Sequence, residues 1–145
     1  MNIWDTAGQE KYNALGYAFY RGTQCCGLVF DLSNPASFEK LDSWKKNFLD
    51  NAAPAEPEKF PFVLIGNKTD LERKVSADQV AAWRAKNDNM PYLETQATAG
   101  TKVEDAFRQM TETTSAQTSD SAVGAMPTSL FAANNAVALS AKDDK

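Results

Sequence analysis

Three uninterrupted apolar runs stand out in the hydrophobic pattern of the chain. They lie at residues 25–32 (CCGLVFDL), 60–66 (FPFVLIG) and 91–95 (PYLET). A strand with one face in water alternates apolar and polar side chains, so continuous apolar character predicts strands that are covered on both faces. A shorter strand is expected to end at Trp4, before the polar turn that follows it.

Helical patterns with recognisable ends separate the apolar runs. The stretch Ser33-Asn34-Pro35 predicts a helix start, because serine and asparagine cap well and proline suits the first turn. Ser76 with Gln79 fits a capping box, in which two residues bind each other's backbone N–H groups. A second capping box is expected at Thr101 and Glu104. Apolar residues then recur at helical spacing, the first set being Phe38, Leu41, Trp44, Phe48 and Leu49.

The alternation of strands and helices predicts an α/β fold in three layers, built on a mostly parallel sheet. Crossovers between parallel strands are right-handed, and ligands of such sheets bind beyond the carboxyl ends of the strands. The turns that follow the strands are therefore the places to search for chemistry. They are residues 5–10, 67–70 and 95–98.

Composition narrows the functional classes. A chain of 145 residues with 43% apolar residues is long enough for one domain and too short to favour two. It holds no histidine, which removes histidine triads and histidine metal sites. The net charge of −4 argues against nucleic acid as a partner. Because no apolar stretch of about 18 residues is present, a soluble, cytoplasmic protein is expected.

Two local features complete the outline. The neighbours Cys25 and Cys26 should point to opposite faces of a strand and serve as small apolar residues. From about Thr113 the composition turns to Ser, Thr, Ala, Gln and Asn. This change predicts a folded domain over residues 1–112 and a disordered tail over residues 113–145.

The turn Asn67-Lys68-Thr69-Asp70 directly follows the second apolar run. A carboxylate at Asp70 can accept two N–H bonds from the edge of guanine, whereas adenine offers no such pair of donors. The stem of Lys68 can cover the face of the base, and Asn67 can tie the turn to neighbouring loops. A solvated turn between a strand and a helix would explain these four residues alone about as well.

The opening turn, WDTAGQE at residues 4–10, contains parts of a phosphate site. Asp5 can hold a water molecule on Mg²⁺, and the backbone N–H of Gly8 can approach a terminal phosphate. Gln9 can orient an attacking water. An ordinary turn that caps the next helix is the alternative, which the order and spacing of the motifs disfavour.

Together these motifs resemble those of small GTPases. Five segments occur in the order of that family: WDTAGQE (4–10), AFYRG (18–22), LVFDLS (28–33), GNKTDL (66–71) and ETQA (94–97). The chain looks like the Rab branch of the Ras superfamily over about residues 1–112. The segments CCGLVFD, SFEKLDSWKKNFL and PEKFPFVLIGNKTDL resemble the late-endosomal and lysosomal Rab subfamily. The implied fold is that of the P-loop GTPases.

The resemblance implies roles for the residues of the opening turn. Asp5 would be the acid on the metal side and would bind Mg²⁺ through water. Gly8 would sense the γ-phosphate, and Gln9 would be the catalytic residue that positions the hydrolytic water. The implied cofactors are GTP or GDP together with Mg²⁺, and the implied function is GTP hydrolysis that regulates late endosomal, lysosomal or vacuolar traffic.

The resemblance also implies a guanine site. Asn67, Lys68 and Asp70 would select the base, and Ala97 would offer it a backbone N–H. Thr98 follows Ala97 in the last nucleotide-binding motif. The family usually has Glu-Thr-Ser-Ala-Lys there, while residues 94–98 are Glu-Thr-Gln-Ala-Thr, so the supporting serine and the stacking lysine stem are replaced.

Protein partners are implied by the same resemblance. Trp4 and Phe19 match members of the aromatic surface that Rab effectors contact, although packing against the sheet is an equal alternative. Residues 10–22 would form the second switch, whose order depends on the γ-phosphate. Exchange factors and GTPase-activating proteins are the other implied partners. The chain ends without paired cysteines, so no direct membrane anchor by prenylation is expected.

Several parts of the family pattern have no match in the chain. No Gly-Lys-Ser or Gly-Lys-Thr triplet occurs, so the P-loop is not found. The first two strands, the first helix and the first switch are likewise unmatched, and we therefore expect an incomplete GTPase that grips phosphate poorly. The alternatives are a divergent interaction module that no longer binds nucleotide and, as a remote third, a phosphoacceptor domain that uses Asp31 and Lys68.

Overall fold

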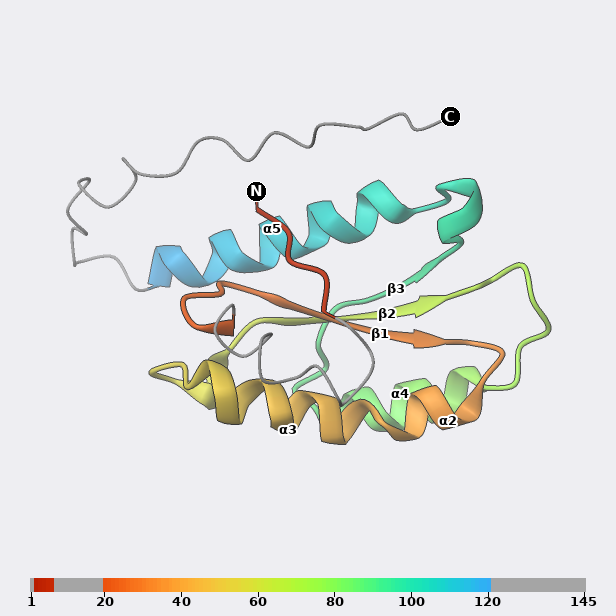
Figure 1. Cartoon of the computed structure of the whole chain (residues 1–145), viewed down its shortest axis with the longest axis horizontal. Coiled ribbons are helices and arrows are strands. Elements are labelled where there is room, and N and C mark those ends of the chain that lie inside the picture. Colours follow the sequence, from red (N-terminus) through yellow and green to blue (C-terminus); the bar gives the residue numbers. More distant parts are fainter. Residues whose placement is uncertain (1, 7–19, 121–145) are drawn as a thin grey trace, which may run out of the picture.

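The computed structural model describes residues 2–6 and 20–120. In these residues it shows an open sheet of three parallel strands in the order β1-β2-β3 (Figure 1). The strands are β1 (Cys26–Asp31), β2 (Phe62–Asn67) and β3 (Tyr92–Thr95). The predicted α/β class and the parallel sheet are confirmed.

Helices cover both faces of the sheet, which confirms the three layers. Figure 1 shows α2, α3 and α4 on one side and α5 on the other. Two short 3₁₀ helices, η2 and η3, lie in the connections. The bounds are α2 (Pro35–Glu39), α3 (Leu41–Ala52), η2 (Pro57–Lys59), α4 (Ala77–Ala85), η3 (Ala97–Ala99) and α5 (Val103–Asp120).

Two apolar clusters hold these layers together. On the side of α2, α3 and α4, a large cluster joins Phe30 and Leu64 of the sheet to helix residues such as Leu41 and Val80. On the side of α5, a smaller cluster joins Val63 and Ile65 to Ala106 and Met110. Every residue of β2 except Asn67 is buried, as its continuous apolar run predicts.

Two of the predicted helix starts are confirmed. Asn34 caps α2 through a hydrogen bond from the Ala36 N–H to its Oδ1 at 3.2 Å. Ser76 and Gln79 form the predicted capping box at the start of α4. A break at Lys40 divides the helical pattern after Asn34 into α2 and α3.

The predicted capping box at Thr101 and Glu104 is wrong. The Thr101 N–H and carbonyl are both bonded to the backbone of Gln96, so this N–H is not available to a glutamate side chain. The Glu104 carboxylate instead pairs with Arg108 at 3.1 Å. Lys102, with a positive φ of 56°, separates the bridge from the first helical residue.

The predicted start of a disordered tail at Thr113 is too early. Helix α5 continues to Asp120, although residues 113–120 are rich in serine and threonine. Three of the hydroxyls bond back to carbonyls four residues earlier: Thr113 to Gln109 at 2.7 Å, Thr114 to Met110 at 2.8 Å and Ser115 to Thr111 at 3.0 Å. Short polar side chains can thus be accommodated within a helix. The rest of the predicted tail, residues 121–145, lies outside the described residues.

The predicted strand ending at Trp4 is also not observed. Residues 2–6 have no regular secondary structure, and Ile3 and Trp4 are 60% and 62% exposed. A strand exists only when a neighbour completes its backbone hydrogen bonds, and no described strand pairs with this segment.

The two cysteines lie on opposite faces, as expected, with Cys26 as the first residue of β1 and Cys25 directly before it. Both are free, and Cys26 packs against the large cluster while Cys25 packs against the smaller one on the opposite face. Burial raises the pKa of both thiols, that of Cys26 to about 12.

Among the described residues, no helix combines the length and the apolar character needed to cross a membrane.

Candidate functional site

The carboxyl ends of the three strands meet at one edge of the sheet. The register pairs Asp31 of β1 with Asn67 of β2, and Asn67 with Thr95 of β3. The turn after β2 is also tied to β3, since the Thr69 N–H donates to the Thr95 carbonyl at 3.3 Å. Polar groups from three distant parts of the chain therefore form one row, at the edge where parallel sheets bind their ligands.

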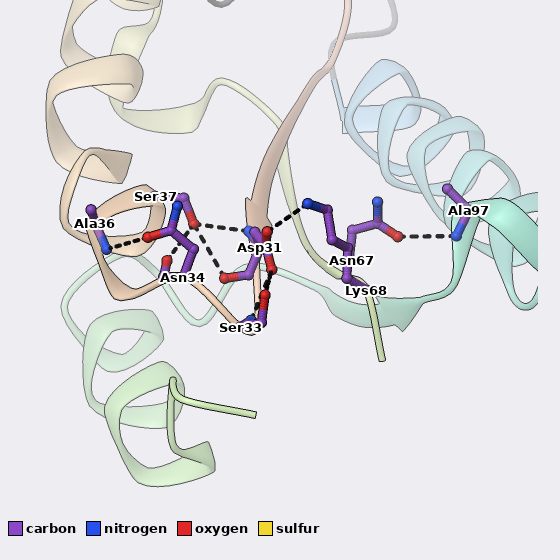
Figure 2. Close-up of polar contacts among 8 residues, drawn as sticks. All are labelled: Asp31, Ser33, Asn34, Ala36, Ser37, Asn67, Lys68 and Ala97. Atoms are coloured by element: carbon purple, nitrogen blue, oxygen red, sulfur yellow. Dashed lines mark hydrogen bonds and ion pairs between the residues drawn. The ribbon is translucent and has the colours of Figure 1, made fainter. Parts of the chain in front are cut away.

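Asn67 joins the turn after β2 to the loop after β3. Its Oδ1 accepts hydrogen bonds from the Thr95 hydroxyl and from the backbone N–H of Ala97, each at 3.1 Å. Figure 2 shows the amide of Asn67 reaching Ala97. Thr95 is only 4% exposed, so the amide also satisfies a buried hydroxyl. The expected role of Asn67 in tying neighbouring loops is confirmed.

Lys68 lies across the ends of β1 and β2. Its Nζ is 2.8 Å from Asp31 Oδ2, as Figure 2 shows. The other carboxylate oxygen, Oδ1, accepts hydrogen bonds from the N–H and the hydroxyl of Ser33, at 2.8 and 2.6 Å. The bond from Lys68 and those from Ser33 lower the pKa of Asp31 to about 2. At neutral pH Asp31 is therefore ionised, and each of its carboxylate oxygens has a partner.

Asp70 differs from the other acids at this edge. Its side chain is exposed, and among the described residues its carboxylate makes no hydrogen bond or ion pair. Asp31 and Glu94, by contrast, are each paired with a cation. An ionised carboxylate is an acceptor with two oxygens, so Asp70 can take two donors from a ligand.

Ala97 and Thr98 lie in η3, exposed at the same edge. The Ala97 N–H already donates to Asn67 Oδ1, so a base carbonyl would have to share this donor or displace that bond. The left-handed Gly100, with φ 70°, ends η3 and returns the chain to the Gln96–Thr101 bridge. The loop after β3 is thus fixed at both ends.

A second ion pair at this edge was not anticipated from the sequence. Arg73 follows the guanine-type turn, and its guanidinium lies 2.5 Å from Glu94 Oε2 in β3. The Tyr92 hydroxyl donates to the other oxygen, Glu94 Oε1, at 2.7 Å. Burial opposes ionisation of Glu94, but the bonds from Arg73 and Tyr92 outweigh it and lower the pKa of Glu94. An acid inside a run of otherwise apolar residues was the available signal, since a covered charge needs a partner.

Tyr92 also explains why a glycine precedes Asn67. A Cβ added to Gly66 would lie 2.8 Å from the Tyr92 hydroxyl and 3.1 Å from Leu32. The Tyr92 ring stacks on Phe30, with centroids 6.4 Å apart. Partial burial, with Glu94 beside it, raises the pKa of Tyr92. The phenol therefore remains protonated and donates to Glu94.

The candidate phosphate-side residues are only partly described. Trp4 and Asp5 are exposed, and no hydrogen bond or ion pair joins Asp5 to Asp31, Lys68 or Asp70. The described residues contain no group of three acids or cysteines that could enclose a metal ion. One isolated carboxylate is a poor fit for Mg²⁺, which favours six oxygen ligands. Gly8, Gln9 and Phe19 lie outside the described residues.

Comparison with known proteins defines the class. The family model described as "Ras: Ras family" matches residues 1–116. The chain therefore belongs to the Ras family, which agrees with its parallel sheet and with the polar turns at the carboxyl edge.

Individual relatives are Rab proteins. The chain is 53% identical over 112 residues to Ras-related protein RABG3f of Arabidopsis thaliana and 51% identical over 112 residues to Ras-related protein Rab7 of Cenchrus ciliaris. It is 49% identical over 120 residues to the Ypt/Rab-type GTPase avaA of Emericella nidulans. The matches cover 74%, 74% and 81% of the chain but 54%, 54% and 58% of the relatives. The chain thus spans about half the length of the curated relatives that it matches.

Proposed function

We propose that this chain carries the guanine-recognition half of a Rab-type GTPase. The observation that supports this proposal is the contrast among the acids at the carboxyl edge: Asp31 and Glu94 are paired with cations, while the exposed carboxylate of Asp70 makes no hydrogen bond or ion pair with the described residues. Guanine offers two adjacent N–H donors that match one carboxylate, and adenine does not.

The neighbouring residues are proposed to orient the base. The stem of Lys68, fixed at its tip by Asp31, would lie against one face of the base. Asn67 would keep the Ala97 loop beside it, and the Ala97 N–H would exchange its bond with Asn67 for one to the guanine carbonyl. Thr98 offers only a short side chain at the place of the family's lysine stem, which favours weak binding.

In the whole protein, the proposed activity is GTP hydrolysis that switches the binding of effectors. Asp5 would contribute to Mg²⁺ binding, Gly8 to γ-phosphate contact and Gln9 to positioning of the water. The similarity to RABG3f and Rab7 supports a role in traffic at late endosomes, lysosomes or the vacuole. Effectors, exchange factors and GTPase-activating proteins are the proposed partners, with Trp4 and Phe19 on the effector surface.

Binding of the base can be tested directly by NMR titration. GDP added to the ¹⁵N-labelled chain is expected to shift the amide signals of Asn67, Asp70 and Ala97, while ADP at equal concentration leaves them in place. Asp70→Ala should abolish the response. Glu58→Gln removes another exposed acid, in η2, and should leave the response unchanged. Equal shifts with GDP and ADP, or none with GDP, would contradict the proposal.

A second candidate function is an interaction module that binds no nucleotide. It is favoured by the adjacent exposed apolar side chains of Ile3 and Trp4 and by the replaced motif residues Gln96 and Thr98. This candidate predicts that GDP shifts no signal at the carboxyl edge. It also predicts that a protein partner quenches or shifts the fluorescence of Trp4, and that Trp4→Phe removes this change in emission.

A further inference from the structure

Asp31 lies outside the guanine-type motif, yet it makes the one ion pair of Lys68 among the described residues. The side chain of Asp31 is 18% exposed and that of Lys68 is 51% exposed, so the carboxylate is largely covered and the lysine is more open to solvent. A free lysine side chain samples many rotamers, and its position is defined only when its tip is held. The 2.8 Å contact with Asp31 Oδ2 supplies that hold.

Asp31 is itself fixed by the start of α2. Its N–H donates to the Ser37 hydroxyl at 2.9 Å, and its carbonyl accepts the Asn34 N–H at 3.0 Å. Its Oδ1 accepts two bonds from Ser33, as Figure 2 shows. Both the backbone and the side chain of Asp31 are therefore held by hydrogen bonds that do not involve Lys68. The end of β1 acts as a rigid anchor.

The backbone of Lys68 needs such an anchor. Its φ of 67° lies in the left-handed region, which is unfavourable for residues that carry a Cβ. The carbonyl of Lys68 accepts the Leu71 N–H at 3.1 Å and so closes the turn that contains Asp70. If the conformation of Lys68 changed, the direction in which Asp70 projects would change with it.

We propose that Asp31 is a positioning residue for guanine recognition: by holding the Lys68 ammonium group, it keeps Lys68 in the left-handed conformation that presents Asp70 at the edge of the sheet. The inference rests on the proposed function, because it assigns a specificity role within that same site. Asp31 does not touch the base in this scheme, and it acts only through Lys68.

A double-mutant cycle, measured without nucleotide, tests whether the ion pair between Asp31 and Lys68 stabilises the turn that contains Asp70. Asp31→Asn keeps an acceptor for Ser33 and removes the charge, and Lys68→Met keeps the stem and removes the ammonium group. Each is expected to speed hydrogen exchange of the Leu71 N–H about fivefold. The double variant should exchange no faster than either single variant. Asp50→Asn, which breaks the exposed pair with Lys46 at 2.5 Å on α3, should have no effect.

The double-mutant cycle distinguishes two roles of Asp31: holding Lys68, as proposed, or stabilising the start of α2. If Asp31 acted through Ser33 and Ser37, Asp31→Asn would add its effect to that of Lys68→Met, and this additive result would overturn the proposal. Unchanged exchange in both single variants would overturn it as well. Circular dichroism of each variant checks that it is folded, and the two single variants probe the same contact from opposite sides.

Nucleotide titration of the same variants tests whether this ion pair contributes to GDP binding. Asp31→Asn and Lys68→Met are each expected to weaken GDP binding about fivefold, again without a further loss in the double variant. If GDP bound the unsubstituted chain but the effects of the two substitutions were additive, only the positioning role of Asp31 would be contradicted, and the proposed function would stand. If the exchange cycle were non-additive but GDP did not bind, the proposed function would fail, and the claim of a guanine role for Asp31 with it.

Discussion

The two ends of the parallel sheet are held together in different ways. At the amino ends of the strands, aromatic rings pack on one another: Phe48 of α3 contacts Tyr20, Phe60 and Phe62, with ring centroids 5.0 to 5.6 Å apart. At the carboxyl ends, side-chain hydrogen bonds and ion pairs connect turns that are far apart in sequence.

This difference separates stability from recognition. Burial of aromatic rings contributes free energy without regard to direction, whereas a polar network defines where each donor and acceptor points. Substitutions at the amino end should therefore lower the free energy of unfolding and leave base preference intact. Substitutions at the carboxyl end should cost less stability and change what the edge can bind.

The largest expected loss of stability comes from Phe48→Ala. Phe48 is 7% exposed, and its truncation removes contacts with three rings. We expect the free energy of unfolding to fall by about 3–5 kcal/mol in urea denaturation. Phe48→Leu, which keeps most of the volume, should lose only about 1 kcal/mol. A loss below 1 kcal/mol for the alanine variant would contradict the assignment of stability to this end.

Asn67→Ala should have the next largest effect, at the opposite end. It leaves the buried Thr95 hydroxyl and the Ala97 N–H without their shared acceptor. A buried group that loses its partner costs about 1–3 kcal/mol, which urea denaturation can measure. Asn67→Asp retains the acceptor and should recover most of the loss. Equal destabilisation by both substitutions would show that the stability contributed by Asn67 does not come from its acceptor oxygen.

Arg73→Met should have a smaller effect on stability. Arg73 and Glu94 are 36% and 31% exposed, and ion pairs accessible to water contribute about 1 kcal/mol or less. The clearer readout is the pKa of Glu94, which should rise when its cation is removed. Titration of the Glu94 carboxyl by ¹³C NMR measures this directly. Glu72→Gln, an exposed neighbour on the same loop, serves as the control.

The acid response of Asp31 is an effect confined to low pH. Its pKa is lowered to about 2 in the folded chain, from about 3.9 in an unfolded one. A depressed pKa means that the carboxylate stabilises the fold above about pH 4 and that this contribution is lost as the pH falls towards 2. Asp31→Asn should flatten the dependence of unfolding free energy on pH in this window. An unchanged slope would contradict the pairing with Lys68.

The sheet could be predicted closely from the sequence because each of its strands lies in a continuous apolar run. The apolar runs gave the three described strands to within two residues at each end, because strands covered on both faces must be apolar throughout. The capping residues Asn34 and Ser76 also acted as expected, since each capping bond is local. Thr101 failed as a cap because its backbone is bonded across a loop to Gln96.

The candidate site could be predicted only in part. Asn67 ends β2 and Asp70 lies in the turn that follows it, so their place at the carboxyl edge follows from the order of elements. The pairs Asp31 with Lys68 and Arg73 with Glu94 depend on which strands are neighbours and in what register, which no local pattern contains. The strand expected at Trp4 depended in the same way on a partner that the described residues do not provide.

We propose that one carboxylate, that of Asp70, selects guanine at this edge of the sheet. Replacing it with asparagine exchanges an acceptor for a donor, and a donor matches the carbonyl at C2 of xanthine better than the amino group of guanine. NMR titration of Asp70→Asn should therefore show loss of the response to GDP and a new response to xanthosine diphosphate at Asn67 and Ala97. An unchanged preference for GDP would contradict this role of Asp70.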